Sequence, residues 1–213
     1  MGLGKTVQVL AWMALDKERH PDGGPVLAVA PTSLVLNWRA EAERFCPGLR
    51  VMTYTGLERS GQVGKFAEND LILTTYGLLL RDVVILTRTR WRCLILDVSQ
   101  NIKNPQSQTA RAARALRAER RLCLTGTPLE NRLDELWSQM HFLNRHLLGS
   151  REGFNSRFGQ PVAMGDAAAR ELLQRVLRPF MLRRTKESVA ADLPEKQETL
   201  LRCQMTESQT RVY

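Results

Sequence analysis

Short apolar runs of strand length alternate with segments of helical periodicity from the start of the chain to about residue 144. The run at residues 25–31 is apolar between two prolines, which is typical of a parallel strand covered on both faces. Four further runs have strand character, at residues 50–55, 71–76, 92–97 and 121–125. Because strands that alternate with helices form βαβ units, this pattern predicts an α/β fold with a mostly parallel sheet and helices on both faces.

The segments between these strands carry apolar residues at helical spacing. Val9 and Met13 predict a helix directly after the first residues of the chain. A second helix begins near Thr32 or Ser33, either of which can cap it, and Trp38 on its apolar face is expected to be a core aromatic. Further helices are predicted at residues 77–87, 107–118 and 129–144.

The alternation of strands and helices is lost after about residue 146. The remaining sequence has helical segments near residues 151–157 and 167–177 and a strand-like segment at 198–205. We therefore predict two parts, an α/β lobe over residues 1–146 and a C-terminal helical extension over residues 147–213.

Four arginines form a basic stripe on the helix predicted at residues 107–118 and just beyond it. Arg111, Arg114, Arg117 and Arg121 fall within roughly a third of the helix circumference. A solvated outer face is the simpler interpretation, and a surface that binds an acidic partner remains open.

The composition is that of an ordinary globular protein with a basic balance. The chain has 213 residues, of which 43% are hydrophobic and 25% charged, and a net charge of +9 with a pI near 9.9. Such a charge favours an acidic polymer as partner. The four cysteines are widely spaced and form no C-x-x-C pair, which predicts no structural metal. The sequence shows no signal peptide and no apolar run of membrane-spanning length. We therefore predict a cytoplasmic protein, nucleoid-associated if bacterial.

The first residues of the chain have the composition of a phosphate-binding loop. Gly2 and Gly4 would let backbone N–H groups approach phosphates, Lys5 would supply a cation, and the Thr6 hydroxyl would bind Mg²⁺. The helix that follows would present its N-terminus to the same anion. The motif is incomplete, because the first glycine of the full pattern would precede Met1, and a glycine-rich helix start with no such role remains an alternative.

A phosphate-binding loop of this kind needs an acid at the end of a second buried strand. Asp97 ends the apolar run at residues 92–97 and fits the role of Mg²⁺ ligand. The polar turns at Thr74–Thr75 and at residues 125–127 also follow strands, so they should lie at the same edge of a parallel sheet.

The motifs together resemble those of the Swi/Snf-type DNA-translocating ATPases, helicase-like proteins of superfamily two. They occur in the family's order at residues 1–8, 30–38, 74–76, 97–104, 124–131 and 180–186. The runs Leu-Thr-Gly-Thr-Pro-Leu-Glu-Asn and Gln-Asn-Ile-Lys-Asn are the most specific among them. The resemblance implies a first RecA-like lobe, a P-loop sheet, followed by the start of the family's helical insertion.

The resemblance also implies roles for individual residues. Those expected at ATP are Gly2, Gly4, Lys5, Thr6 and Gln8, with Thr6 and Asp97 at Mg²⁺. Those expected to sense the γ-phosphate and couple it to DNA are Gln100, Thr125, Gly126 and Thr127. Those expected along the backbone of double-stranded DNA are Ser33, Asn37, Thr75, Lys103 and Asn104, where phosphate contacts would position the lobe without reading sequence.

The chain departs from the family in three places. Val98 stands where the family has a glutamate that activates or positions water, a loss that costs roughly 10²–10⁴-fold in rate. The chain begins inside the phosphate loop at Met1 and ends at Tyr213, before the second RecA-like lobe with its arginine finger. We therefore expect a fragment of a longer gene or a misassigned reading frame, with little turnover without that lobe. A catalytically inactive nucleotide- or DNA-binding module and a non-functional gene remnant remain alternatives.

Overall fold

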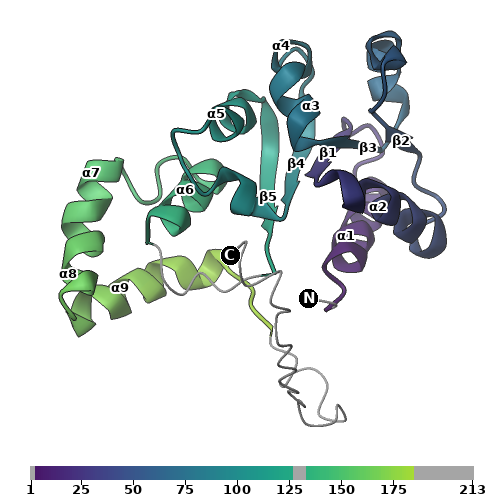
Figure 1. Cartoon of the computed structure of the whole chain (residues 1–213). Coiled ribbons are helices and arrows are strands. Elements are labelled where there is room, and N and C mark those ends of the chain that lie inside the picture. Colours follow the sequence, from purple (N-terminus) through teal and green to yellow (C-terminus); the bar gives the residue numbers. More distant parts are fainter. Residues whose placement is uncertain (1–2, 127–132, 185–213) are drawn as a thin grey trace, which may run out of the picture. The chain divides into compact units, whose positions relative to one another are not determined.

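The computed structural model describes residues 3–126 and 133–184, and it divides the chain into compact units at residues 1–180 and 181–213. The first unit contains a five-stranded sheet with helices around it (Figure 1). The strands are β1 (Val26–Ala30), β2 (Val51–Thr53), β3 (Leu71–Thr75), β4 (Trp91–Asp97) and β5 (Ala118–Leu124). They lie in the order β2-β3-β1-β4-β5, and every pair is parallel. The predicted α/β fold with a parallel sheet is confirmed.

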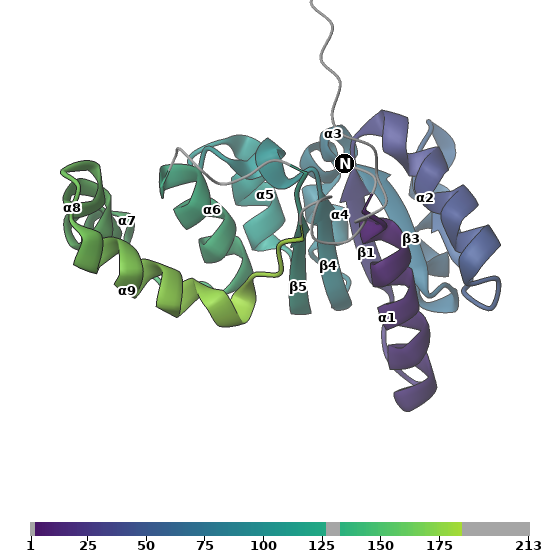
Figure 2. The ribbon, with the colours of Figure 1, turned by 90° about the horizontal axis from the view of Figure 1, so that it is seen from below.

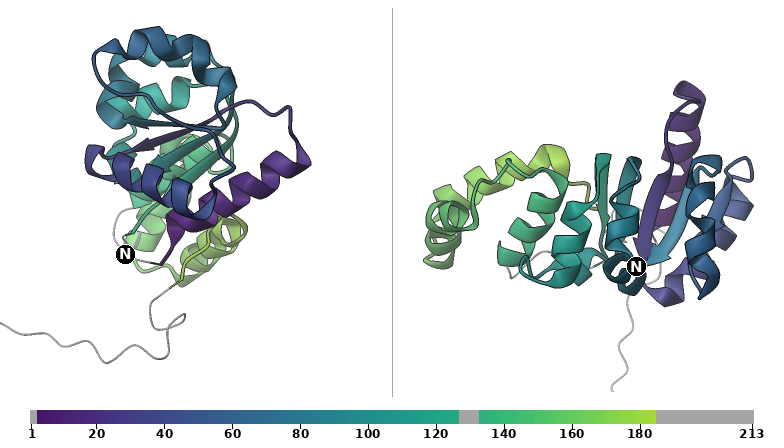
Figure 3. Two further views of the ribbon diagram at one scale, coloured as in Figure 1. Left: turned by 90° about the vertical axis from the view of Figure 1, so that its right-hand side faces the viewer. Right: turned by 90° about the horizontal axis from the view of Figure 1, so that it is seen from above.

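Helices cover both faces of the sheet because successive strand residues point to opposite sides. On the first face pack α1 (Lys5–Arg19) and α2 (Thr32–Phe45), against a core that includes Ala28 and Ile95. On the second face the core includes Leu27 and Leu94, the sequence neighbours of those residues. Figures 2 and 3 show α1 and α2 on one side of the strands and the helices within residues 58–86 on the other.

The second face is covered by shorter elements. They are η1 (Glu58–Glu68), α3 (Tyr76–Arg81), α4 (Val83–Leu86), η2 (Ser99–Ile102), α5 (Gln108–Ala115) and α6 (Leu133–Leu143). Buried Trp91, Phe66 and Phe142 belong to this core. The helix predicted at residues 77–87 is present as two short helices, α3 and α4. The helix predicted at 129–144 is present as α6, and its residues 129–132 lie outside the described part of the chain.

Two details of the helices differ from the sequence-based expectation. The N-cap of α2 is Pro31, without a side-chain cap hydrogen bond, so neither Thr32 nor Ser33 caps this helix. The Leu34 N–H instead donates to the Pro31 carbonyl oxygen at 2.9 Å, which satisfies one donor of the first turn without a polar cap. Helix α5 ends at Ala115 because Leu116 is already extended, with ψ 141°.

The early end of α5 changes the interpretation of the arginine stripe. Arg121 lies on β5 and not on the helix, while Arg117 lies between the two elements. Arg111 and Arg117 are exposed, but Arg114 and Arg121 are half-buried. A continuous solvated stripe is therefore wrong for Arg114 and Arg121.

A further set of helices follows α6. They are α7 (Arg151–Phe154), the π-helical turn η3 (Asn155–Gly159), α8 (Gln160–Ala163), α9 (Ala167–Leu177) and η4 (Arg178–Phe180). Phe154, Phe158, Leu173 and Leu177 pack with the outer face of α6 in a third apolar cluster. The predicted helical extension is confirmed, and its domain boundary at residue 146 stays a prediction. The strand-like segment 198–205 lies outside the described residues.

Candidate functional site

The polar turns predicted from the sequence meet at one edge of the sheet. Ala30 pairs with Thr75, and Asp97 pairs with Leu124, so β1, β3, β4 and β5 end at nearly the same level. In a parallel sheet this edge, at the carboxyl ends of the strands, is where ligands bind. It is also the edge at which α1 begins.

The N-terminus of α1 is prepared for an anion. Gly4 has φ 68° and ψ 29°, a left-handed conformation that glycine adopts without strain, and the helix starts at Lys5. The first turn contains no acidic residue and no side-chain cap hydrogen bond, so its N–H groups stay available to a ligand. Gln8 braces the turn, because its Nε2 donates to the Leu3 carbonyl oxygen at 3.3 Å.

A cavity of about 650 Å³ joins this helix start to the end of β4. Its wall includes Gly4, Lys5, Thr6, Asp97, Val98 and Gly126. The structure thus brings together the loop cation, the loop hydroxyl and the strand-end acid, which are about ninety residues apart in the sequence. Gly2 and Thr127, also predicted here, lie outside the described residues.

Asp97 is held in one orientation by three neighbours. Trp38 Nε1 donates to Asp97 Oδ2 at 2.8 Å, and the Val98 N–H donates to Oδ1 at 2.9 Å. The Tyr76 hydroxyl donates to the Asp97 carbonyl oxygen at 2.7 Å. Asp97 is only 7% exposed, so these hydrogen bonds compensate for much of its lost hydration. Each carboxylate oxygen keeps a further lone pair for a ligand.

Trp38 and Tyr76 are functional neighbours that the sequence reasoning missed. Trp38 is fully buried, as expected for a core aromatic, but its indole N–H also orients the strand-end acid. Burial raises the pKa of the Tyr76 hydroxyl well above its usual range, so this group stays a neutral donor to Asp97. The sequence offered one signal: a buried tryptophan or tyrosine usually needs a hydrogen-bond partner for its N–H or O–H group.

Val98 adopts a strained backbone conformation beside the acid. Its φ of 53° and ψ of 58° are left-handed, which is a genuine outlier for a β-branched residue. The turn is held by Asn101, whose backbone N–H and side-chain Nδ2 both donate to the Val98 carbonyl oxygen, at 3.2 and 2.9 Å. The apolar Val98 side chain therefore occupies a cavity-lining position with no proton acceptor of its own.

The two segments predicted to sense the γ-phosphate contact each other. Gln100 lies in η2, after β4, and its Nε2 donates to Thr125 Oγ1 at 2.6 Å. Thr125 directly follows β5, and the next residue, Gly126, lines the cavity. This hydrogen bond links the ends of two neighbouring strands at the cavity.

The residues predicted to contact DNA follow the same strand ends but differ in accessibility. Ser33, Lys103 and Asn104 are exposed. Thr75 is buried, and its hydroxyl oxygen accepts a hydrogen bond from the Leu78 N–H at 3.3 Å, which caps α3. Asn37 lines the cavity itself, where its Nδ2 donates to Glu41 Oε1 at 2.9 Å.

The donor set of this cavity fits a magnesium nucleotide better than a metal held by protein alone. Mg²⁺ is usually bound by one or two protein oxygens together with phosphates and water, and Thr6 and Asp97 can supply that contribution. Among the residues that the structure describes, no group of three His, Cys, Asp or Glu gathers to hold a metal ion. Nor does the described part contain a helix that is long and apolar enough to cross a membrane.

Comparison with known proteins agrees with this geometry. The sequence profile of the SNF2-related domain matches residues 1–213. The chain is 39% identical over its whole length to Helicase ssl-1 of Caenorhabditis elegans and to Helicase domino of Drosophila melanogaster, and spans 9% and 7% of those proteins. It is also similar to the Sulfolobus solfataricus SWI2/SNF2 ATPase core in complex with dsDNA, with 42% identity and a TM-score of 0.83 over 100% of this chain and 45% of that one.

The family profile and the Sulfolobus structure both match this chain over its whole length. Whole-chain coverage of a protein with the same RecA-like architecture explains why the phosphate loop, the strand-end acid and the later helices occur together here. The chain belongs to the SNF2-related family of Swi2/Snf2-type helicase ATPases and corresponds to their N-terminal lobe.

Proposed function

We propose that this chain is the ATP-binding lobe of a DNA-dependent Swi2/Snf2-type translocase, and that it binds ATP with Mg²⁺ at the carboxyl edge of its sheet. The observation that carries the proposal is the shared cavity of Lys5, Thr6 and Asp97. The pairing of a loop cation with a strand-end acid is the arrangement that P-loop NTPases use for a nucleotide and its metal.

Each residue of the cavity has a separate task in this proposal. Gly2, Gly4 and the first N–H groups of α1 hold the phosphates, and Gln8 keeps the loop in shape through its hydrogen bond to Leu3. Lys5 neutralises the terminal phosphates. Thr6 and Asp97 hold Mg²⁺, which when bound would draw negative charge from the β- and γ-phosphate oxygens. Trp38 and Tyr76 fix Asp97 in position.

Coupling in this proposal runs through the hydrogen bond between Gln100 and Thr125. A contact to the γ-phosphate at residues 125–127 would move Gln100, and with it the exposed segment at Lys103 and Asn104. Double-stranded DNA is the partner that a net charge of +9 and the DNA complex of the Sulfolobus protein support. With this partner the chain would be cytoplasmic, and nucleoid-associated if its source is bacterial.

Val98 favours a second candidate function, nucleotide binding with little hydrolysis. A valine can neither accept a proton from water nor orient it, so turnover should be reduced by roughly 10²–10⁴-fold, while phosphate binding is retained. A second RecA-like lobe with an arginine finger would contribute a further 10³–10⁵-fold, roughly, as in related NTPases. The two candidate functions therefore share the binding site and differ in the chemical step.

Binding of a fluorescent ATP analogue tests the phosphate-loop assignment. The full chain should bind it in a Mg²⁺-dependent manner, and Lys5→Ala should weaken binding at least tenfold because the phosphate charge loses its fixed counter-charge. Lys65→Ala is the matched control, because Lys65 is exposed on η1, away from the cavity wall. Equal affinities for the two variants would contradict the assignment.

A second experiment separates hydrolysis from backbone strain at position 98. Val98→Glu should restore DNA-stimulated ATP hydrolysis only when a second lobe is supplied in trans. Val98→Gly is the control, because glycine relieves the left-handed backbone by about 1 kcal/mol without adding a carboxylate. Substantial hydrolysis by the unmodified chain, or equal rescue by glycine, would show that the valine is not the cause of low turnover.

A further inference from the structure

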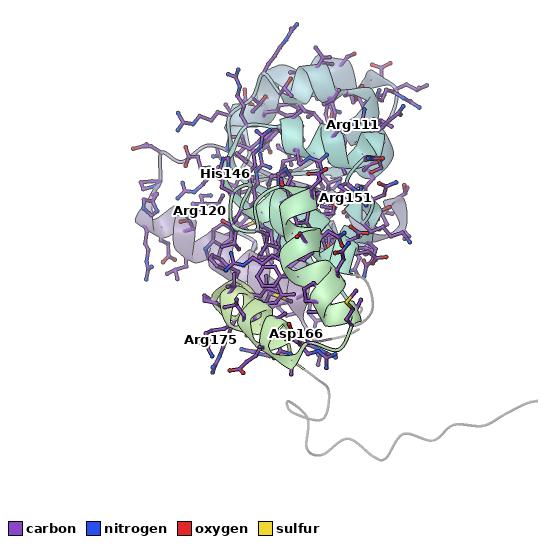
Figure 4. The ribbon with its side chains drawn as sticks, turned by 90° about the vertical axis from the view of Figure 1, so that its left-hand side faces the viewer. Arg111, Arg120, His146, Arg151, Asp166 and Arg175 are labelled. Carbon is purple, nitrogen blue, oxygen red and sulfur yellow. The ribbon has the colours of Figure 1, made fainter. Side chains whose placement is uncertain are left out.

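A second cavity, of about 630 Å³, lies where α5, β5 and the end of α6 meet. We call it the arginine cavity, after the four residues Arg111, Arg114, Arg121 and Arg145 that line it with His141 and Glu119. Figure 4 views the molecule from the side that carries α5 and the later helices, with Arg111 labelled. The residues come from three elements that are separate in sequence, so the concentration of charge results from folding.

Two of these guanidinium groups are fixed by backbone carbonyls. Arg121 donates from Nη1 to the Phe142 oxygen at 3.1 Å and from Nη2 to the Leu116 oxygen at 2.9 Å, and its guanidinium lies 5.0 Å from the Phe142 ring centroid. Arg114 donates from Nη2 to the Pro105 oxygen at 2.5 Å. The other terminal nitrogen of Arg114, Nη1, is buried and has no hydrogen-bond partner among the described residues. A buried charged donor without a partner is costly unless a ligand satisfies it.

The positive charge of the cavity is not neutralised by the described part of the chain. None of the four arginines forms an ion pair with an acidic residue there. Glu119, on the wall, is 3.2 Å from Arg90 Nη2, an arginine outside the cavity. Burial, followed by repulsion from Arg111 and Arg145, lowers the pKa of Arg114, and burial lowers that of Arg121 in the same way. The cluster is thus electrostatically unfavourable without a bound anion.

This cavity is distinct from the candidate nucleotide site. It lies at Ala118 and Glu119, the first residues of β5, whereas the nucleotide cavity is reached at Gly126, beyond the last residue of that strand. Seven strand residues span roughly 20 Å. The two cavities share no lining residue, so one phosphate group cannot occupy both.

We propose that the arginine cavity binds a phosphate group. Arginine presents a planar fork of N–H donors that matches phosphate oxygens in pairs, and the Arg114 guanidinium on the cavity wall is fixed in direction by its hydrogen bond to Pro105. The flexible, exposed side chains of Arg111 and Arg145 complete the site from α5 and from the segment after α6. The phosphate belongs either to a free oligophosphate or to a nucleic-acid backbone, and both present the same chemistry to the cavity.

Calorimetric titration with tripolyphosphate tests this site directly. All proteins in the test carry Lys5→Ala, so that the phosphate loop does not contribute, and the salt concentration is about 0.15 M to screen non-specific attraction. We expect saturable binding that Arg114→Gln weakens at least tenfold. The matched control Arg88→Gln removes the same charge from an exposed site outside the cavity and should change the affinity less than twofold.

A second variant protects the test against a folding defect in Arg114→Gln. Arg145→Gln alters an exposed side chain and should weaken binding about fivefold with an unchanged melting temperature. Absence of saturable binding, or equal affinities for the Arg114, Arg145 and Arg88 variants, would overturn the proposal. Addition of duplex DNA then identifies the source of the phosphate. Displacement of tripolyphosphate would indicate a DNA backbone phosphate, and undisturbed binding a free oligophosphate.

Discussion

Arg120 and Arg121 are neighbours on β5, yet the two faces of the sheet treat them in opposite ways. Arg120 points to the face of α1, where its Nη1 lies 2.9 Å from Asp16 Oδ1. Arg121 points to the face of α6, where its partners are carbonyl oxygens and the ring of Phe142. Because side chains alternate along a strand, Arg120 reaches a carboxylate whereas Arg121 reaches none.

The neutralised side is built around one carboxylate. Asp16 is 7% exposed and forms ion pairs with Arg120 and with Arg92, which also donates to the His20 carbonyl oxygen at 3.1 Å. The one acid on the wall of the arginine cavity, Glu119, pairs with Arg90 and not with the arginines of the cavity. The difference indicates that the first cluster serves stability and the second is available to a ligand. The following predictions either remove the carboxylate from the Asp16 cluster or add one to the arginine cavity.

The largest effect on stability is expected from removing the Asp16 carboxylate. Asp16→Asn should reduce the free energy of unfolding by about 3 kcal/mol, because it leaves the largely buried Arg92 without its counter-charge. Urea unfolding followed by circular dichroism measures the change. Asp22→Asn, in an exposed turn of the same connection, is the control and should lie within about 0.5 kcal/mol of the unmodified chain. A loss below that level for Asp16→Asn would show that this cluster is not structural.

The next effect is a dependence of stability on pH. Hydrogen bonding to Arg92, opposed by burial and reinforced by Arg120, lowers the pKa of Asp16 from 3.8 to about 2. Because the folded-state pKa is the lower one, this stabilisation is fully present well above pH 4 and is lost as the pH falls from about 4 to 2.

Unfolding curves recorded between pH 6 and pH 2 test this dependence. The stability difference between the unmodified chain and Asp16→Asn should be constant above pH 5 and should shrink below pH 4. A difference that stays constant down to pH 2 would contradict the ion-pair explanation. In that case the effect of the substitution would come from packing or from hydrogen bonding.

Much of the fold was predictable because the buried strands are visible in the sequence as short apolar runs. Continuous apolar runs gave all five strands to within a few residues, and their parallel pairing followed from the helices between them. The shared cavity of Lys5 and Asp97 was predictable for the same reason, since the carboxyl ends of parallel strands lie at one edge.

The features that escaped prediction depend on contacts between distant residues or on exact element ends. The hydrogen bond from Trp38 to Asp97 joins residues 59 positions apart, and no local pattern marks it. The left-handed conformation of Val98 opposes the preference of valine and is imposed by the surrounding turn. The arginine cavity was missed because the sequence pattern grouped its arginines with a helical stripe. In the structure α5 ends at Ala115, Arg121 turns inward from β5, and Arg145 joins the cavity from beyond α6.

The smallest effect on stability should come from adding to the arginine cavity a carboxylate that can pair with its guanidinium groups. Asn144 lines this cavity and is exposed, so Asn144→Asp places a carboxylate beside the arginines without disturbing the core. The free energy of unfolding should rise by less than about 1 kcal/mol, as for other exposed ion pairs. Tripolyphosphate affinity should nevertheless fall at least tenfold, because the new charge competes with the ligand for the same guanidinium groups.

Asn69→Asp is the control, because it adds the same charge outside the arginine cavity. Unchanged phosphate affinity in Asn144→Asp, with normal unfolding, would show that the arginines are not organised around one anion. A loss of affinity equal to that of Asn69→Asp would show that only the net charge matters. A loss of affinity in Asn144→Asp alone would show that a paired carboxylate closes the cavity to phosphate, as Asp16 neutralises the arginines on the other face.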